Sequence, residues 1–434
     1  MAGVGRQRAE AGLQDATKDS EPIFRIQSVT VVNLRAEMIP SRTFGHMEFE
    51  RSAPLSYHCQ SRRRGRQGNV LPEKILINPS ESKRIDHWPA LDGARGIAVL
   101  LVLLDHASNY GMVLFPGADF HRAGKYGVYL FFVLSAFLLT SQFYVRRQEE
   151  FLDARTWFNF ACRRFLRIFP VYSVVLLAMI AMGKLEKADF LTHLLLRDGK
   201  RAFWTIPVEV KFYVLLPFVV FALFWAGRKH WLWGVAAGLG AVGVGAAILA
   251  LEQPWSLQQN VLLAPNLAPF FMGSIAAIAY GRLQQHDAMQ RWAPWLRLAA
   301  GVAFAGILLR IPSLYNLLFS QDDPVGKLAG DAAICGTLWS VFILGTIQGK
   351  GWLSCAMQWK PLRFLGLISF SAYLWHGKFV TDVDDLPVPP VLRLLAFLGI
   401  VVAVATVSYF LFERPLLRIR PRKPVPPVLE PAPG

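Results

Sequence analysis

Cysteine is scarce in this chain of 434 residues, and the spacing of the few cysteines does not suggest that they act together. Cys59, Cys162, Cys335 and Cys355 form neither the close pairs of a metal site nor the pattern of a disulfide framework. The residues before 88 also lack the apolar core of a signal peptide. We therefore expect no metal ion, no disulfide scaffold and no secretion signal.

Acidic residues are the minority among the charged ones. The chain has 30 Asp and Glu against 46 Lys and Arg, which gives a net charge of +16. Such an excess in a soluble protein would favour nucleic acid as a partner. Here much of the basic charge lies in short stretches between long apolar runs. We therefore interpret it as a membrane-topology signal and expect no nucleic-acid binding.

Long apolar runs dominate the rest of the chain, which is 53% hydrophobic with a mean hydropathy of +0.34. Runs of about 20 residues, long enough for a helix to cross a bilayer, recur from Arg95 to the C-terminal region. Only a helix satisfies its own backbone in lipid, so we predict an all-α, polytopic transmembrane bundle. About ten spans are expected, near 95–114, 126–145, 168–183, 206–226, 231–251, 264–281, 295–311, 328–348, 364–381 and 391–412.

Basic residues follow every second apolar run. No Lys or Arg occurs in 252–262 or 381–390, which belong to the opposite set of connections, although 184–201 holds five. By the positive-inside rule, both termini are expected to be cytoplasmic. The basic residues behind this expectation are Arg146, Arg147, Arg155, Arg163, Arg164, Arg167, Arg228, Lys229, Arg282, Arg291, Lys350, Lys360, Arg363, Arg414, Arg418, Arg420, Arg422 and Lys423.

Composition divides the chain into three parts. Residues 1–87 are polar and irregular, and we expect a disordered N-terminal extension. An alternative is upstream sequence from a start codon assigned too early, with Met38 or Met47 as the true start. Residues 88–420 hold the apolar runs and form the expected transmembrane domain. Residues 421–434 are rich in proline and are expected to be a cytoplasmic tail.

Arg95 and His106 are the two residues that stand out. They lie eleven positions apart with an almost unbroken apolar run between them. On a helix, eleven steps of about 100° bring both side chains to one face, roughly 16 Å apart along the axis. A cation would then lie near the membrane surface and an imidazole near the membrane middle. An ionisable group at that depth is costly, which makes it a candidate for function.

These two residue types suit different tasks. A guanidinium stays charged and matches phosphate groups with two parallel hydrogen bonds, so Arg95 is a candidate anion ligand. Its alternative is a plain anchor at the membrane surface. The imidazole of His106 can accept a proton from a hydroxyl near neutral pH. Its alternative is a packed core histidine. Asp105 is adjacent but points about 100° away, so it is not an obvious partner.

Three further ionisable residues lie at the ends of expected spans. Glu209 can act as a base or hold a sugar hydroxyl, with a structural ion pair as the alternative. His376 lies on the outward half of the ninth span, where its aromatic neighbours suit a membrane interface. Glu413 is expected to neutralise one of the arginines at 163, 164 or 167. The remaining histidines are expected to be solvated, namely His46, His58, His87, His121, His193, His230 and His286.

Six segments, in this order, resemble motifs of the acyltransferase 3 family, whose members are integral-membrane enzymes that O-acylate sugars, polysaccharides and some small natural products. The resemblance covers roughly residues 88–420. Two positions differ from the usual residues: Tyr129 stands where Asp is common, and Ala136 where Gly is usual. The segments are Leu91-Asp92-Gly93-Ala94-Arg95-Gly96 leading to His106, 127–138, 163–170, Val208-Glu209 with Phe212-Tyr213, 371–376 and Glu413-Arg414-Pro415.

The resemblance implies a donor and roles for the site residues. The donor is expected to be an acyl-CoA, most simply acetyl-CoA, as a co-substrate without any bound cofactor. Arg95, with Arg163, Arg164 and Arg167, is expected to bind the coenzyme phosphates from the cytoplasmic side. His106 would act as general base or as a transient acyl carrier, with Glu209 as a second catalytic residue. Acceptor binding is expected at Glu209, Tyr213 and His376.

The resemblance also implies a location and a set of partners. We expect a multi-pass protein of the bacterial inner membrane whose acceptor is a carbohydrate or another molecule with a hydroxyl group. The chain is expected to lack the extracytoplasmic hydrolase-like domain of some members. It is therefore expected to acylate its own acceptor or to pass acyl groups to a separate partner. The acceptor stays open among polysaccharides, lipid-linked glycans and metabolites, and succinyl stays open as the acyl group.

A membrane transporter or flippase of a glycan or lipid intermediate is the alternative function. About ten spans with a few buried ionisable groups are compatible with it. The absence of an internal repeat and the scarcity of broken-helix signals weigh against many transporter folds. A purely structural membrane subunit explains neither His106 nor Glu209. We therefore expect an acyltransferase.

Overall fold

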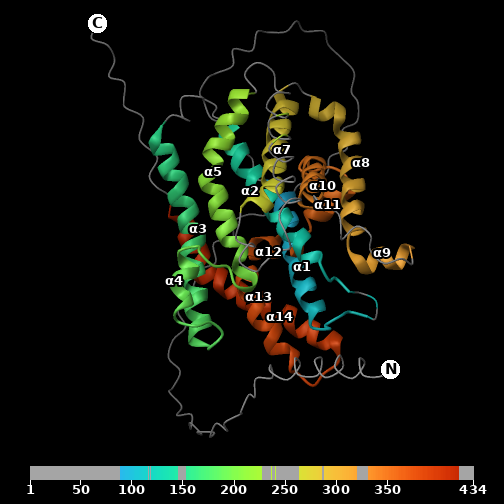
Figure 1. The fold of residues 1–434 in the computed structure, drawn as a ribbon. Coiled ribbons are helices and arrows are strands. Elements are labelled where there is room, and N and C mark those ends of the chain that lie inside the picture. Colours follow the sequence, from blue (N-terminus) through green and yellow to red (C-terminus); the bar gives the residue numbers. More distant parts are fainter. Residues whose placement is uncertain are drawn as a thin grey trace, which may run out of the picture. The chain divides into compact units, whose positions relative to one another are not determined.

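Helices make up every regular element of the described part of the chain, as expected from the long apolar runs (Figure 1). The structure, a computed structural model, describes residues 88–115, 117, 119–144, 153–226, 236, 240, 263–285, 288–319 and 331–419. No strand occurs within these residues, which confirms the all-α prediction for them. The extension 1–87, the tail 421–434 and nearly all of the expected span 231–251 lie outside the described residues.

The helices follow one another in a single compact unit. Their bounds are α1 Pro89–Asn109, α2 Ala123–Tyr144, α3 Ala154–Ala181, α4 Asp189–Leu194, η2 Arg201–Trp204, α5 Thr205–Ala226, η4 Ala264–Asn266, α7 Leu267–Gln285, α8 Ala288–Leu308, α9 Pro312–Phe319, α10 Asp331–Thr346, α11 Trp352–Met357, α12 Lys360–Leu367, α13 Ser369–Asp384, α14 Pro390–Ser408, η6 Tyr409–Glu413 and α15 Arg414–Arg418.

Several of these helices are long and apolar enough to cross a membrane. Four continuous stretches qualify by length and composition, namely 123–143 in α2, 154–181 in α3, 202–220 in η2 and α5, and 390–418 in α14 to α15. A fifth arises if α8 and α9 form one broken span, although they meet at 95° (Figure 1). The chain is therefore a membrane protein. The expected ten spans and the side on which the termini lie stay predictions.

The helix that contains the third expected span, 168–183, begins earlier than that span. Helix α3 is 28 residues long and begins at Ala154, where the carboxylate of Asp153 accepts a hydrogen bond of 3.0 Å from the backbone N–H of Arg155. This N-cap starts the helix well before its sequence becomes apolar. Arg163, Arg164 and Arg167 consequently lie within α3 and not in a connecting loop.

Two other expected spans also have different bounds. The first expected span, 95–114, is α1 at Pro89–Asn109, with a proline in its first turn. The ninth, 364–381, is divided into α12 and α13 around Ile368.

Helix α1 packs closely against the segments that follow α10. A Cβ atom added at Gly93 would lie 1.8 Å from the carbonyl oxygen of Met357, and one at Gly366 would lie 1.8 Å from that of Asp92. Both distances are far below van der Waals contact, so the two backbones approach as closely as glycine allows. This close packing fixes the first turns of α1, from which Arg95 projects.

Helices α2 and α7 form a second close interface. Ala136 of α2 is fully buried, and its Cβ would lie 3.0 Å from a Cβ added at Gly273 of α7. The difference from the family's usual glycine at Ala136 is therefore accommodated by a glycine on the opposite helix. Tyr129 is also buried in this core, with 2% of its surface exposed.

The connection between α3 and α5 does not extend away from the helices as a solvated loop. His193 of α4 is fully buried, and its Nδ1 is hydrogen-bonded to the Tyr172 hydroxyl of α3 at 3.2 Å. The expectation that His193 is solvated is therefore wrong. Because this connection packs along the second half of α3, α5 begins level with the middle of α3, where Thr205 and Ile168 border the same cavity.

Candidate active site

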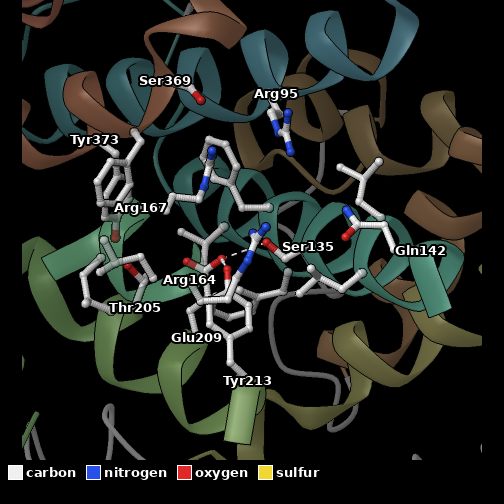
Figure 2. A pocket seen from close by; sticks show the side chains of 18 residues that line it. Arg95, Ser135, Gln142, Arg164, Arg167, Thr205, Glu209, Tyr213, Ser369 and Tyr373 are labelled. Atoms are coloured by element: carbon white, nitrogen blue, oxygen red, sulfur yellow. Dashed lines mark hydrogen bonds between the residues drawn. The ribbon is translucent and has the colours of Figure 1, made fainter. Parts of the chain in front are cut away.

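A cavity of about 180 Å³ lies between α1, α2, α3, α5 and α13 (Figure 2). Its walls combine charged, hydroxyl-bearing and apolar side chains, and both Arg95 and Glu209 line it. The full lining consists of Arg95, Val128, Phe131, Phe132, Ser135, Leu138, Leu139, Gln142, Arg164, Arg167, Ile168, Thr205, Ile206, Glu209, Tyr213, Ser369, Phe370 and Tyr373.

Three guanidinium groups converge on this cavity. Arg95 comes from α1, and Arg164 and Arg167 come from one face of α3 because they are three residues apart (Figure 2). Arg95 also lies 3.9 Å from the Asp92 carboxylate. Glu209 is the single carboxylate among the described residues that line the cavity. The cavity therefore has an excess of positive charge and is suited to an anionic ligand.

Glu209 is held by two hydroxyl groups. Ser135 of α2 donates a hydrogen bond of 2.8 Å to its Oε1, and Tyr213, one turn further along α5, donates a short hydrogen bond to the same oxygen. The guanidinium carbon of Arg164 lies 5.8 Å from the centroid of the Tyr213 ring. Glu209 and Tyr213 therefore belong to the arginine-lined cavity, together with Ser135, which the sequence reasoning did not single out.

Arg163 lies elsewhere. Its Nε donates a hydrogen bond of 3.1 Å to the carbonyl oxygen of Asn159, and the residue does not line the cavity. Successive helical residues point about 100° apart, so Arg163 cannot share the inward face of Arg164. Of the four arginines expected at the donor site, the structure brings three together and leaves Arg163 apart.

Glu413 is buried, with 2% of its surface exposed, at the end of η6. Its Oε2 accepts a hydrogen bond of 3.2 Å from the Ser371 hydroxyl of α13. Among the cations, the charges of Arg167 and Arg95 act on it. This environment agrees with the expected structural role next to the α3 arginines.

His106 and His376 form a separate pair. Their rings pack edge to face with centroids 4.7 Å apart, and neither residue lines the arginine cavity. The Nδ1–H of His106 donates to the Val102 carbonyl at 3.0 Å, and that of His376 donates to the Tyr373 carbonyl at 2.6 Å. These bonds require a proton on Nδ1 in both rings, so in a neutral ring the lone pair lies on Nε2.

Asp105 serves the loop after α1. Its Oδ2 lies 3.5 Å from Nδ1 of His106, but that nitrogen is already bonded to Val102. The Asp105 carboxylate instead accepts hydrogen bonds from the backbone N–H groups of Arg122 and Gly124 at the start of α2. Asp105 therefore lies within ion-pair distance of His106, closer than the sequence reasoning expected, while its hydrogen bonds hold the loop.

Tyr373 connects the cavity to the histidine pair. Its side chain lines the cavity, and its ring centroid lies 5.4 Å from that of His376. Its ring also packs at 6.4 Å against Phe131, another residue of the cavity wall. Arg95 and His106 do share helix α1, but Arg95 enters the cavity while His106 lies beyond Tyr373 and His376.

Metal ligation has no support in the described residues, which contain no group of three or more His, Cys, Asp or Glu side chains that could hold an ion. The polar lining of the cavity also includes Gln142, Thr205 and Ser369. These three were not predicted. Their only signal in the sequence is that they are polar residues inside or next to apolar runs.

The model of a known family, described as an acyltransferase domain, matches residues 88–413. The chain belongs to this family, acyltransferase 3. It is therefore an enzyme of the class that transfers acyl groups, as the resemblance implied. The matched region contains all the residues of the cavity and the histidine pair. No solved structure matches the chain.

Several curated relatives are also similar. The chain is 23% identical over 368 residues to peptidoglycan O-acetyltransferase OatA of Listeria monocytogenes, covering 76% of this chain and 55% of that protein. It is 22% identical over 363 residues to putative peptidoglycan O-acetyltransferase YrhL of Bacillus subtilis, covering 76% and 54%. The chain thus spans about half the length of these relatives. Neither is named as a transporter, so the alternative of a transporter gains no support.

Proposed function

We propose that this chain is a membrane-bound O-acetyltransferase that moves an acetyl group from acetyl-CoA to a hydroxyl of a cell-envelope glycan. The convergence of Arg95, Arg164 and Arg167 on one cavity is the observation that carries the proposal. Relatives named as peptidoglycan O-acetyltransferases favour acetyl as the acyl group and a glycan as the acceptor. The bacterial inner membrane is the proposed location.

The arginine cavity is the proposed entrance for the donor. Coenzyme A is polyanionic, and three guanidinium groups opposed by one carboxylate can bind its phosphates with charge-assisted hydrogen bonds. Helix α3 is longer than the roughly 20 residues needed to cross the hydrocarbon, so its first turns can lie at headgroup level. Arg164 and Arg167 would then lie near the cytoplasmic surface. The pantetheine arm would extend inward, past Tyr373, toward the histidine pair.

His106 is the proposed general base. Its Nε2 lone pair accepts the proton of the acceptor hydroxyl while the hydroxyl oxygen forms a bond to the thioester carbonyl carbon. The carbon–sulfur bond then breaks, and the coenzyme A thiolate takes the proton back from His106. The products are the acetyl ester and free coenzyme A. Holding donor and acceptor together in a water-excluded site would supply much of the rate enhancement.

A transient acyl group on His106 is the alternative route for the same reaction. In that case Nε2 attacks the thioester carbon first, and the acceptor hydroxyl then attacks the acyl-imidazole. Mass spectrometry of protein quenched with acetyl-CoA in the absence of acceptor separates the two routes. A mass increase of one acetyl group on the His106 peptide supports the carrier route. Unmodified peptide, from protein that transfers acetyl groups once acceptor is added, supports the general base.

The test of the proposed function uses full-length protein reconstituted in lipid. The protein is incubated with labelled acetyl-CoA and an extract of envelope glycans, next to a His106→Ala control. Label that enters a glycan only with the intact histidine supports the proposal. Folded protein that binds neither acetyl-CoA nor succinyl-CoA would overturn it. Label from succinyl-CoA alone would keep the reaction class and correct the acyl group.

A further inference from the structure

A second cavity, of about 330 Å³, lies beside the first. It is formed where the connection between α3 and α5 packs against α13, so that Lys184, Asp189 and Phe203 face Leu374, Gly377 and Lys378. Its volume falls at the lower end of the range of about 300–1,000 Å³ that is typical of small-molecule sites. Neither the family match nor the proposed function assigns it a role.

Charged groups of both signs line this cavity, and each of its three lysines is paired with a carboxylate. Lys200 binds Asp189 at 2.8 Å, while Lys184, at 3.3 Å, and Lys378 both bind Asp382. Because these charges largely compensate one another, the cavity does not share the positive excess of the arginine cavity. It offers many hydrogen-bond donors and acceptors close together, with the aromatic ring of Phe203 in the wall. A neutral molecule rich in hydroxyl groups fits this lining, because each hydroxyl both donates and accepts.

Tyr373 links the walls of the two cavities. Tyr373 lines the arginine cavity, and its hydroxyl donates a hydrogen bond of 2.6 Å to the carbonyl oxygen of Ala202, which lines the second cavity. The next residues along the chain repeat this division, because Phe203 borders the second cavity and Thr205 the first. Tyr373 therefore lies where a path from the second cavity to the arginine cavity and the ring of His376 would run.

We infer that the second cavity is the acceptor site, which holds a neutral stretch of glycan while one of its hydroxyls passes Tyr373 to reach the thioester. The inference rests on the proposed function and assigns donor and acceptor to different cavities. The hydroxyl oxygen then bonds to the acyl carbon, the carbon–sulfur bond breaks, and coenzyme A leaves with the hydroxyl proton. Glu209 and Tyr213 lie with the arginines on the donor side of this arrangement.

Gly377 gives a direct test, because a Cβ added there would meet no atom within 4 Å. Gly377→Leu should fill the second cavity without disturbing the packing of α13. Gly399→Leu is the matched control, since Gly399 also lies on a helix with open space around its Cβ, on α14 and away from both cavities. The probes are N-acetylglucosamine tetramer as acceptor and acetyl-CoA as donor. The rate of acetyl transfer gives the KM of each substrate, and saturation-transfer NMR measures the Kd of the tetramer directly.

The expected result separates the two substrates. Gly377→Leu should raise the KM and Kd of the tetramer by about tenfold or more, which corresponds to about 1.4 kcal/mol. The acetyl-CoA KM of Gly377→Leu should stay close to that of the unmodified protein. The KM and Kd of the tetramer should be unchanged in Gly399→Leu. Unchanged tetramer binding by folded Gly377→Leu would overturn the inference. Unmodified protein that binds acetyl-CoA but not the tetramer would overturn it too, while the donor half of the proposed function would stand.

A second variant guards against misfolding of Gly377→Leu. Glu186 lines the second cavity from an exposed turn, so Glu186→Gln removes one acceptor charge at little risk to the fold. We expect its tetramer KM to rise by about fivefold, because the amide oxygen still accepts a hydrogen bond but without the charge that strengthens it. Lys187→Gln is the control, because Lys187 is the next residue and does not line the cavity. Equal tetramer KM values for the two variants would contradict the inference.

Discussion

The imidazole rings of His106 on α1 and His376 on α13 meet edge to face, with centroids 4.7 Å apart. Each ring donates its Nδ1–H to a carbonyl of its own helix, so the tautomer and orientation of both are fixed before any substrate binds. Nε2 of His376 is buried and has no hydrogen-bond partner in the described part of the chain. His106 is the more exposed of the two, which favours it as the group that meets the acceptor hydroxyl.

Replacement of His106 with Asn tests this assignment. The Asn amide can still donate to the Val102 carbonyl, as Nδ1–H does now, but it has no basic nitrogen in place of Nε2. We expect the kcat of acetyl transfer to fall by about 100-fold or more, since general-base catalysis contributes about 10²–10⁴-fold. Acetyl-CoA binding, measured by calorimetry, should not change.

The control for this variant is His121→Asn. His121 lies in the loop before α2, where its Nδ1 is hydrogen-bonded to the Asn109 side chain at 2.5 Å. This substitution should leave transfer and donor binding as they are. If His106→Asn keeps a kcat near that of the unmodified protein, His106 is not the base.

Substitutions of the four arginines that the sequence groups together should differ in their effect on donor affinity. Lys in place of Arg95, Arg164 or Arg167 keeps the charge but loses the paired hydrogen bonds of the guanidinium. We expect each change to raise the acetyl-CoA KM by about tenfold or more, because a hydrogen bond to a charged group contributes about 1.5–3 kcal/mol. Arg163→Lys is the matched control and should have no effect, since Arg163 lies outside the cavity. Equal effects at positions 163 and 164 would contradict the donor assignment.

Glu209→Gln should affect turnover without weakening donor binding. The substitution removes the one negative charge among the described residues that line the arginine cavity, so the attraction of the cavity for an anion should grow. The amide oxygen can still accept the hydrogen bond from Ser135. We expect the acetyl-CoA KM to stay constant or fall while kcat falls. A higher donor KM with an unchanged kcat would show that Glu209 only maintains the shape of the cavity.

The longest helices of this fold were predictable because they are apolar runs, and run length requires a helix in lipid. The start of α3 was not predictable from hydropathy, because Arg163, Arg164 and Arg167 lower the average over its first half. The information lay in the N-cap at Asp153, a local hydrogen bond that an average over 20 residues does not register. The burial of His193 was missed for a related reason, because it depends on Tyr172 of another helix.

The candidate site was predictable in its residue types but not in its grouping. Arg95, Glu209 and His376 were selected because ionisable groups within apolar runs are costly. Their separation into an arginine cavity and a histidine pair depends on the packing of Tyr373 between the cavity and His376, which no local pattern encodes. The choice of Arg164 over Arg163 likewise requires knowledge of which face of α3 turns toward α1.

The close contact between α1 and α12 gives a prediction for stability. A methyl group at Gly366 would lie 1.8 Å from the Asp92 carbonyl oxygen, so Gly366→Ala must separate the two helices. We expect the free energy of unfolding to fall by at least about 1–3 kcal/mol, as it does when a core is overpacked. The methyl group that Gly301→Ala adds on α8 has no atom within 4 Å, so this substitution should leave the stability unchanged or raise it slightly. Thermal unfolding in detergent compares the two, and equal melting temperatures would contradict the close contact.

Acid should loosen the connection between α3 and α5 through His193. Burial holds the pKa of His193 below its usual value, an effect to which Lys200 adds and which Asp198 and Asp189 oppose. As the pH falls through about 6.5, the opened segment gains a proton that the folded segment does not, so folding of the segment becomes less favourable. We therefore expect faster hydrogen exchange in 184–200 at pH 5.5 than at pH 7.5, after correction for intrinsic rates.

His193→Gln should remove this acid sensitivity. The Gln side chain does not titrate and can still form a hydrogen bond with the Tyr172 hydroxyl. Hydrogen exchange in 184–200, corrected for intrinsic rates, should therefore be the same at both pH values. His121→Gln, which alters an exposed histidine of another loop, should retain the acid sensitivity of the unmodified protein. If the His193 variant loosens in acid as the unmodified protein does, the carboxylates of Asp189 and Asp198 are responsible instead. Because this segment forms one wall of the second cavity, its loosening in acid should also weaken the binding of a glycan there.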